Sequence, residues 1–351
     1  MESSKADMTG VQDTLMFREA AEAGAAVRRQ RAENRAAVAD LARALAARKP
    51  SLLLTCARGS SDHAATFAKY LIETRLGIPV ASYAPSLASL YQSLMPGLAG
   101  QVLLLISQSG RSPDLLLSAE AARRAGALTV ALVNDAASPL AAAVDAVVPL
   151  HAGPETSVAA TKSYIATLAA LVDLVAAWAD QRDLLDALER LPDDLEAAWR
   201  AEWEIPQAFA SARNLFVLGR GLTLGVAAEA ALKFKECCAI HGEAFSLAEV
   251  AHGPMALVGP GFPLLVFPPL DEARAGADAL LADFAARGAD IAVAGEGFAS
   301  THPLPVAAGL HPATAPIAMI QSFYRFANRL SLMRGLDPDR PPSLAKVTKT
   351  R

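Results

Sequence analysis

The sequence predicts an α/β fold made of two tandem, doubly wound parallel sheets, each enclosed by helices in a three-layer α-β-α arrangement. Short apolar runs alternate with helical segments along most of the chain, which is the pattern of βαβ units. The pattern at residues 54–59 returns at residues 216–221, and Arg220 follows Arg58 at an offset of 162 residues (220 − 58). Such an offset indicates two copies of one domain. A chain of 351 residues, 53% of them hydrophobic, is large enough for both copies.

The expected strands are short apolar runs bounded by turn residues. In the first copy they occupy residues 52–56, 79–83, 102–106, 128–133 and 146–150. The clearest helices of this copy are expected at residues 64–73, 115–124 and 165–178. In the second copy, strands are expected at residues 264–267, 290–294 and 304–307.

These elements divide the chain into five segments. They are an N-terminal helical segment at 1–50, a first α/β domain at 51–180, a charged pair of linker helices at 181–206, a second α/β domain at 207–335 and a proline-containing tail at 336–351. The tail is expected to fold over the site and bring a lysine to it.

Composition excludes several classes of protein. The net charge of −4 argues against nucleic acid or an anionic membrane as a partner. No apolar run is long enough to span a bilayer, and the polar start of the chain does not resemble a signal peptide. Three cysteines without metal-ligand spacing indicate reduced core residues of a cytoplasmic protein. We expect a reaction that uses no metal and no organic cofactor.

A serine-rich turn is the clearest candidate site. Residues 107–112 read Ser-Gln-Ser-Gly-Arg-Ser, between a fully apolar run and a helix that starts near Pro113. A helix N-terminus suits a phosphate group. Hydroxyl and amide donors come from Ser107, Gln108, Ser109 and Ser112. The plainer interpretation is a turn whose hydroxyls cap the helix. The second copy has Pro-Pro-Leu-Asp after its matching strand, which predicts one phosphate site per chain.

A second strand-to-helix turn supports the functional interpretation. Gly59, Ser60 and Ser61 follow the first strand, directly after Arg58. Because the carboxyl ends of parallel strands share one edge of a sheet, both turns are expected at the same edge. Residues 153–163 form a further loop before the long apolar helix. They either start that helix or line the pocket through backbone groups.

The richest cluster of titratable residues lies in the second copy. Glu229, Lys233 and Glu236 are spaced for one helix face, and the apolar surroundings are expected to desolvate Glu236 in part. His241 and His252 follow, both able to titrate near neutral pH. We interpret His241 as structural and His252, in a His-Gly-Pro turn, as functional.

Together these motifs resemble the sugar-isomerase (SIS) domain family, over residues from about 30 to the end. The resemblance is to the isomerase half of glucosamine–fructose-6-phosphate aminotransferases and to the related stand-alone deaminases. The motifs that carry it are Gly59-Ser60-Ser61, Ser107-Gln108-Ser109-Gly110, Val158-Ala159-Ala160-Thr161-Lys162, Leu232-Lys233-Phe234-Lys235-Glu236, His252-Gly253-Pro254 and Leu344-Ala345-Lys346.

The resemblance implies a role for each site residue. It implies that the serine turn binds a sugar 6-phosphate and that Ser61 contacts the sugar. Glu236 would move a proton between C1 and C2, and His252 would assist ring opening, often across a dimer interface. Lys346 would lie at the sugar carbonyl and form a Schiff base. The remaining expected sugar-binding residues are Gly59, Ser60, Val158 and Arg58.

Two departures from the aminotransferases favour a deaminase. Arg58 stands where they tend to have cysteine, and Ala160 where they tend to have serine. The sequence also lacks their glutamine-hydrolysing domain. The expected reaction converts D-glucosamine 6-phosphate to fructose 6-phosphate and ammonia, in a homodimer with a shared active site. The alternatives are a deaminase for galactosamine 6-phosphate or another amino-sugar phosphate, an aldose–ketose isomerase, and a non-catalytic sugar-phosphate sensor.

Overall fold

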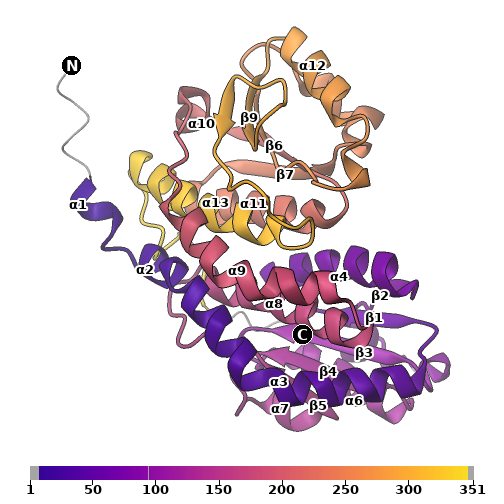
Figure 1. Ribbon diagram of the computed structural model, residues 1–351. Helices are drawn as coiled ribbons and strands as arrows, with labels where there is room; N and C mark the ends of the chain where they lie inside the picture. The colour runs from indigo at the N-terminus through magenta and orange to yellow at the C-terminus, as the bar shows by residue number, and fades with distance from the viewer. Residues whose placement is uncertain (1–7, 94, 347–351) are drawn as a thin grey trace. The chain divides into compact units, whose positions relative to one another are not determined.

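The computed structural model of the chain describes residues 8–93 and 95–346 (Figure 1). Expectations for residues 1–7 and for the last five tail residues, 347–351, lie outside the described part. The described residues form two compact units. The N-terminal sheet unit comprises residues 25–154, 163–190 and 345–346, and the C-terminal sheet unit comprises residues 8–24, 155–162 and 191–344.

The N-terminal sheet unit contains one parallel sheet in the order β2-β1-β3-β4-β5. Its strands are β1 (Leu53–Cys56), β2 (Val80–Ser82), β3 (Val102–Ser107), β4 (Leu128–Val133) and β5 (Ala146–Pro149). Its helical segments are α3 (Ala23–Arg48), α4 (Ser60–Leu76), α5 (Ser86–Ser89), η1 (Pro96–Leu98), α6 (Pro113–Arg124), α7 (Pro139–Ala143), α8 (Lys162–Trp178) and the first half of α9 (Arg182–Arg200).

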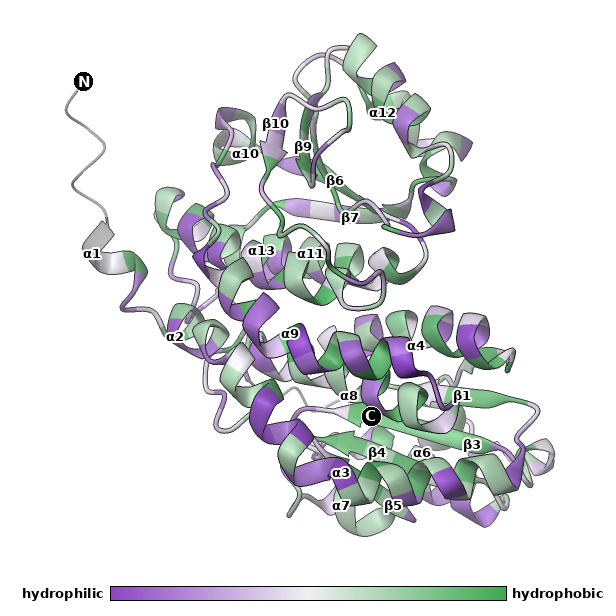
Figure 2. Ribbon diagram, in the orientation of Figure 1, coloured by the Kyte–Doolittle hydropathy of each residue, from purple (hydrophilic) through white to green (hydrophobic). Residues whose placement is uncertain are grey.

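Both faces of this sheet are apolar, because helices cover both. Leu103 and Leu105 of β3 pack with Leu115 and Ala119 of α6 on one face. Alternate residues of the same strands turn to the other face, where side chains of α3, α4 and α8 meet them. Figure 2 shows the resulting apolar strands β1, β3 and β4. The strands are therefore continuous hydrophobic runs, as the sequence pattern predicts.

The C-terminal sheet unit repeats this topology. Its order β10-β9-β8-β6-β7 is the first order with β6 in the place of β1. Its strands are β6 (Asn214–Gly219), β7 (His241–Ser246), β8 (Pro263–Val266), β9 (Asp290–Ala294) and β10 (His302–Leu304). Its helical segments are α1 (Met8–Val11), α2 (Leu15–Ala21), α10 (Gln207–Ser211), α11 (Leu222–Cys238), η2 (Glu249–His252), η3 (Pro254–Leu257), η4 (Glu272–Arg274), α12 (Ala277–Ala286) and α13 (Ala315–Met333).

The predicted internal repeat is confirmed down to backbone angles. Gly59 precedes α4 with φ 56° and ψ −133°, and Gly221 precedes α11 with φ 60° and ψ −129°. Positive φ is a conformation that glycine adopts without the steric cost of a Cβ. Both copies therefore enter their first helix through the same glycine-dependent turn.

Three sequence expectations need correction. The expected linker helix pair is one helix, α9, which continues through Pro192. Pro192 has no N–H for the Leu188 carbonyl, but Arg31 Nη1 donates to that carbonyl at 3.1 Å. The strand expected at 304–307 is instead β10, which ends at Leu304. Pro305 follows it and has no N–H for the ladder.

The third correction is β7, an edge strand that was not expected. It begins at His241 and, among the described strands, pairs only with β6. Its sequence, His-Gly-Glu-Ala-Phe-Ser, contains no continuous apolar run. Within the described residues, no helix combines the length and apolar character needed to cross a bilayer.

Candidate active site

The serine turn lies where ligands bind in this type of sheet. In the N-terminal sheet unit the strand order reverses between β1 and β3, which are hydrogen-bonded neighbours. The crevice beyond the carboxyl ends of such a strand pair is the usual ligand site of a doubly wound sheet. The Gly59 turn follows β1 and the serine turn follows β3, so the structure brings both predicted turns to this point.

Hydrogen bonds within the serine turn fix its shape. The buried Ser107 hydroxyl accepts a bond from the Gly110 N–H at 3.0 Å. Ser109 Oγ accepts one from the Arg111 N–H at 3.4 Å. Ser112 is the N-cap residue of α6, but its side chain makes no capping bond. Its hydroxyl is therefore not used as a cap, which leaves it available for an anion at the helix N-terminus.

The backbone geometry at Gly110 leaves no room for a side chain. Its φ is +62°, and a Cβ built there would lie 2.1 Å from Ser138 Oγ. Ser138 in turn caps α7 by accepting a bond from the Ala141 N–H. The backbone of the serine turn therefore packs directly on the start of α7.

Arg58 and Asp114 connect the two turns. Arg58 Nε and Nη2 lie 2.9 and 2.8 Å from Asp114 Oδ2. Asp114, in the first turn of α6, is fully buried, whereas half of the Arg58 side chain is exposed. Asp114 Oδ1 accepts a further bond from the Leu115 N–H at 2.9 Å. The pair thus holds a guanidinium at the edge where both turns end.

The remaining residues of the Gly59 turn lie at the start of α4. Ser60 and Ser61 are half-buried, and the Ser61 N–H donates to the Arg58 carbonyl at 3.2 Å. Burial raises the pKa of the neighbouring Asp62 carboxyl, although His63 and Arg58 oppose the shift.

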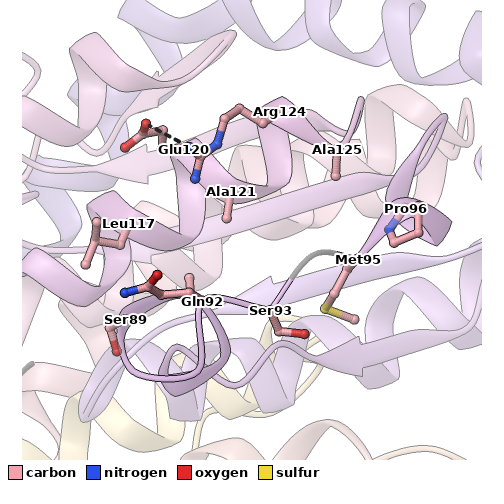
Figure 3. Close-up of a pocket in the computed structure, with 11 residues that line it drawn as sticks. Ser89, Gln92, Ser93, Met95, Pro96, Leu117, Glu120, Ala121, Arg124 and Ala125 are labelled. Carbon is pink, nitrogen blue, oxygen red and sulfur yellow. Dashed lines mark ion pairs between the residues drawn. The ribbon is translucent and has the colours of Figure 1, made fainter.

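A separate groove of about 800 Å³ lies between residues 88–96 and the outer side of α6 (Figure 3). Leu117, Ala121 and Ala125 form its apolar side, and the ion pair of Glu120 with Arg124 runs along α6 beside it. None of the predicted sugar-phosphate residues lines this groove.

In the C-terminal sheet unit, Glu236 belongs to a buried charge cluster on α11. Lys233 Nζ lies 2.6 Å from Glu236 Oε2 and 3.2 Å from Glu229 Oε1. Tyr324 of α13 donates from its hydroxyl to Glu229 Oε1 at 3.2 Å. The Lys233 and Glu229 side chains are buried, and the Glu236 side chain is 20% exposed, as the partial desolvation expected from sequence requires.

The cluster keeps Lys233 positively charged. Burial by itself would lower the pKa of Lys233, but the carboxylates of Glu229 and Glu236 outweigh burial and raise it. The charged ammonium holds one carboxylate oxygen of Glu236 through a charge-assisted hydrogen bond.

Three predicted residues lie on loops or short helices. Val158 is half-buried in the loop before α8, and His252 is exposed at the end of η2. The φ of +136° at Gly253 turns the chain directly after His252. Lys346 is half-buried near the end of the described tail. His241, taken as structural, opens the edge strand β7 and is exposed.

Two residues of the site were not found from sequence. Asp114, in the first turn of α6, has no role in the sequence-based prediction, and Tyr324 lies on α13, outside the expected elements. Neither carries a local signal, because each is defined by a partner far along the chain. A buried acid beside an exposed arginine is recognisable only in the folded structure.

Comparison with known proteins agrees with this architecture. The SIS domain matches residues 48–177 and 208–295. The isomerizing glutamine–fructose-6-phosphate aminotransferase of Methanothermobacter thermautotrophicus is 36% identical over 300 residues, covering 82% of this chain and 50% of that protein. The chain thus spans about half the length of the curated relatives it matches.

Solved structures of related proteins have the same fold as this chain. A Silicibacter pomeroyi protein provisionally assigned as a phosphosugar isomerase is 43% identical with a TM-score of 0.88, covering 93% of this chain and 100% of that one. The C-terminal domain of glucosamine–fructose-6-phosphate aminotransferase from Francisella tularensis is 26% identical with a TM-score of 0.82, covering 94% of this chain and 98% of that one. The chain is therefore a member of the SIS domain family, related to these aminotransferases and to phosphosugar isomerase-like proteins.

Proposed function

We propose that this protein is an amino-sugar-phosphate deaminase, which converts D-glucosamine 6-phosphate and water to fructose 6-phosphate and ammonia. The observation that carries the proposal is the fixed carboxylate of Glu236, held by the buried Lys233 at 2.6 Å. A carboxylate anchored through one oxygen, on a side chain that is 20% exposed, suits proton transfer between adjacent carbons. The serine turn supplies the phosphate site that this substrate class needs.

The proposed reaction balances without a cofactor. His252 assists opening of the ring to the C1 aldehyde. Glu236 takes the proton from C2, and the C2–H electron pair forms the C1–C2 double bond of an enolamine. The electrons of the C1 carbonyl bond move to its oxygen, which takes up a proton from solvent and becomes a hydroxyl. Glu236 then returns the proton to C1, which leaves a C2 imine. Water adds to C2, and the C–N bond breaks to release ammonia and form the ketone. Lys346 holds the sugar at its carbonyl during these steps.

The cysteines of this chain do not resemble the nucleophile of a glutamine-hydrolysing site. Glutamine hydrolysis by cysteine needs an accessible thiolate. Cys56, Cys237 and Cys238 are all buried and free of disulfides. Burial raises the pKa of Cys56 and of Cys237 to about 12, and that of Cys238 well above its ordinary value. None of the three is suited to attack glutamine.

We also propose a homodimer with a shared active site. The exposure of His252, on a short 3₁₀ helix, supports this assignment because a catalytic histidine that acts in a partner's site must be accessible in its own chain. Mixing the His252→Ala and Glu236→Gln variants tests it. A shared site predicts recovered activity in mixed dimers, whereas sites built within one chain predict none.

The primary assay measures ammonia and fructose 6-phosphate formed from D-glucosamine 6-phosphate without glutamine. Glu236→Gln is expected to lose about 10²- to 10⁴-fold in turnover while still binding fructose 6-phosphate. Glu120→Gln is the matched control, because Glu120 is exposed and pairs only loosely with Arg124 at 3.6 Å. Normal turnover in Glu236→Gln would contradict the proposal.

The second candidate is an aldose–ketose isomerase, which the 43% identity to the Silicibacter protein favours. It predicts interconversion of glucose and fructose 6-phosphates without ammonia release. Activity on galactosamine 6-phosphate alone would support the proposed deaminase reaction but assign it a different amino-sugar substrate. Binding of sugar phosphates with no turnover of any of them would identify a sensor.

A further inference from the structure

The short helix α2 is held at its start by the C-terminal tail. The first two N–H groups of the helix, from Leu15 and Met16, donate to the Asp339 carboxylate at 2.6 and 2.8 Å. Both carboxylate oxygens are used, one for each N–H. The tail that continues to Lys346 is therefore attached to α2 by a two-bond clamp.

The other half of α2 holds the loop that carries Val158. Glu19, with 7% exposure, accepts three hydrogen bonds from this loop. They come from the Thr156 N–H at 2.5 Å, the Thr156 hydroxyl at 2.8 Å and the Ser157 N–H at 3.1 Å. A buried carboxylate is costly unless donors satisfy it, so the loop and Glu19 stabilise each other.

Helices α11 and α13 fix α2 between these two attachments. Gln321 Nε2 of α13 donates to the Ala20 carbonyl at 2.9 Å. Met16 Sδ lies 3.7 Å from Sγ of Cys237, the residue directly after Glu236. The Met16 side chain is fully buried. One seven-residue helix thus contacts the Val158 loop, the tail and the end of α11 that carries the proposed base.

We propose that α2 is a positioning element of the active site, with Glu19 and Asp339 as its positioning residues. Glu19 sets the backbone of the Val158 loop, and Asp339 sets the tail that bears Lys346. The inference rests on the proposed function, because it assigns α2 the task of holding two groups that the reaction uses. Helix α2, which belongs to the N-terminal helical segment expected from sequence, thereby becomes part of the proposed catalytic architecture.

A purely structural role makes a different prediction. If Glu19 and Asp339 only stabilise the fold, their loss lowers the melting temperature and leaves turnover by the folded fraction unchanged. A positioning role predicts a reduced kcat of the folded protein at temperatures well below the melting transition, since a misplacement of about 1 Å can cost about 100-fold in rate. The KM should change less than kcat, because phosphate binding is assigned to the serine turn.

The experiment compares Glu19→Gln and Asp339→Asn with the control Asp337→Asn. Each glutamine or asparagine keeps one accepting oxygen and replaces the other with an NH₂ group, which cannot accept the second N–H. Asp337 is exposed on the same tail and accepts only the Asp339 N–H among the described contacts, which an amide oxygen can still do. Thr156→Val is a milder variant that removes a single donor.

Three readouts are taken on the full chain: hydrogen exchange of peptides covering residues 15–22 and 155–162, steady-state kinetics, and borohydride trapping of fructose 6-phosphate on Lys346. Glu19→Gln is expected to speed exchange at Thr156 and Ser157 and to lower kcat about 10- to 100-fold. Asp339→Asn is expected to speed exchange at the start of α2 and to reduce trapping by about tenfold or more.

The outcomes separate this inference from the proposed function. Hydrogen exchange can be measured without turnover. If the wild-type protein is inactive and the loop still exchanges faster in Glu19→Gln, the proposed deaminase function is contradicted, whereas the contacts by which Glu19 holds the loop are supported. An active wild-type protein whose two variants keep normal kcat and trapping overturns the inference alone. Loss of activity that only parallels a lower melting temperature also overturns it.

Discussion

The Arg58 guanidinium donates a hydrogen bond from Nε to Oδ2 of the fully buried Asp114 at 2.9 Å, and its Nη2 forms an ion pair with the same oxygen at 2.8 Å. Arg58 is the second residue after β1, and Asp114 lies in the first turn of α6, the helix that follows β3. The pair therefore joins the two turns that flank the reversal of strand order. It fixes a half-exposed cation beside the predicted phosphate site.

Removing Arg58 should weaken sugar-phosphate binding more than it affects chemistry. Arg58→Gln is expected to raise KM about tenfold, equivalent to about 1.4 kcal/mol, with little change in kcat. Kinetics at several substrate concentrations measure the two constants. Arg111→Gln is the control, because Arg111 lies in the serine turn but pairs with Asp135 instead. Equal effects of the two variants would show that only net charge matters.

Gly110 should tolerate no side chain. Gly110→Ala combines a positive φ with a Cβ that would lie 2.1 Å from Ser138 Oγ, so the serine turn must shift. Gly77→Ala is the control, since Gly77 has a φ of +67° and nothing within 4 Å of its Cβ position. Gly77→Ala should cost about 1–2 kcal/mol of stability and keep phosphate binding. Gly110→Ala should cost more and lose binding, measured by calorimetry with fructose 6-phosphate.

Lys233 should be essential for folding as well as for activity. Lys233→Met leaves two carboxylates, Glu229 and Glu236, without the cation that they share, and is expected to cost about 3–5 kcal/mol of unfolding free energy. The double variant Lys233→Met with Glu229→Met removes one of these charges and should recover part of the loss. Denaturant unfolding measures both. A double variant that is less stable than the single one would contradict this account.

Asp145 should make stability depend on pH in the acid range. Burial favours a higher pKa for Asp145, but hydrogen bonds from Thr129 and the charge of Arg123 outweigh it and lower the pKa below 3.8. A carboxyl with a lowered folded-state pKa stabilises the fold above its unfolded pKa, and this contribution is lost as pH falls through the folded value. Asp145→Asn should therefore be destabilised at pH 7.

The measurement for Asp145 is urea unfolding of wild type and variant at several pH values. The difference between the two free energies should stay constant above about pH 5 and shrink below about pH 4. Asp186→Asn is a suitable control, because Asp186 is 64% exposed and lies 3.5 Å from Arg182 on one helix. A difference that does not change with pH would rule out titration of Asp145 as its source.

Local patterns predicted most strands and both site turns. The strands at 128–133 and 290–294 lie as expected, because a strand buried on both faces leaves an uninterrupted apolar run in the sequence. The edge strand β7 was missed for the same reason, since its exposed polar residues leave no such run. The continuation of α9 through Pro192 could not be predicted either. The hydrogen bond that Pro192 cannot donate to the Leu188 carbonyl is supplied by Arg31, which lies on another helix.

By itself, the sequence determined the α/β class, the internal repeat and the serine turn, because each depends on neighbouring residues or on glycine. Only the tertiary structure decided which partner each buried carboxylate finds. Arg58 with Asp114, Tyr324 with Glu229, and Glu19 with the loop before Val158 are joined by folding across 56, 95 and 137 or 138 residues. A polar side chain carries no sign of its distant partner. Burial favours each of these pairings, since a carboxylate without donors inside the protein is costly.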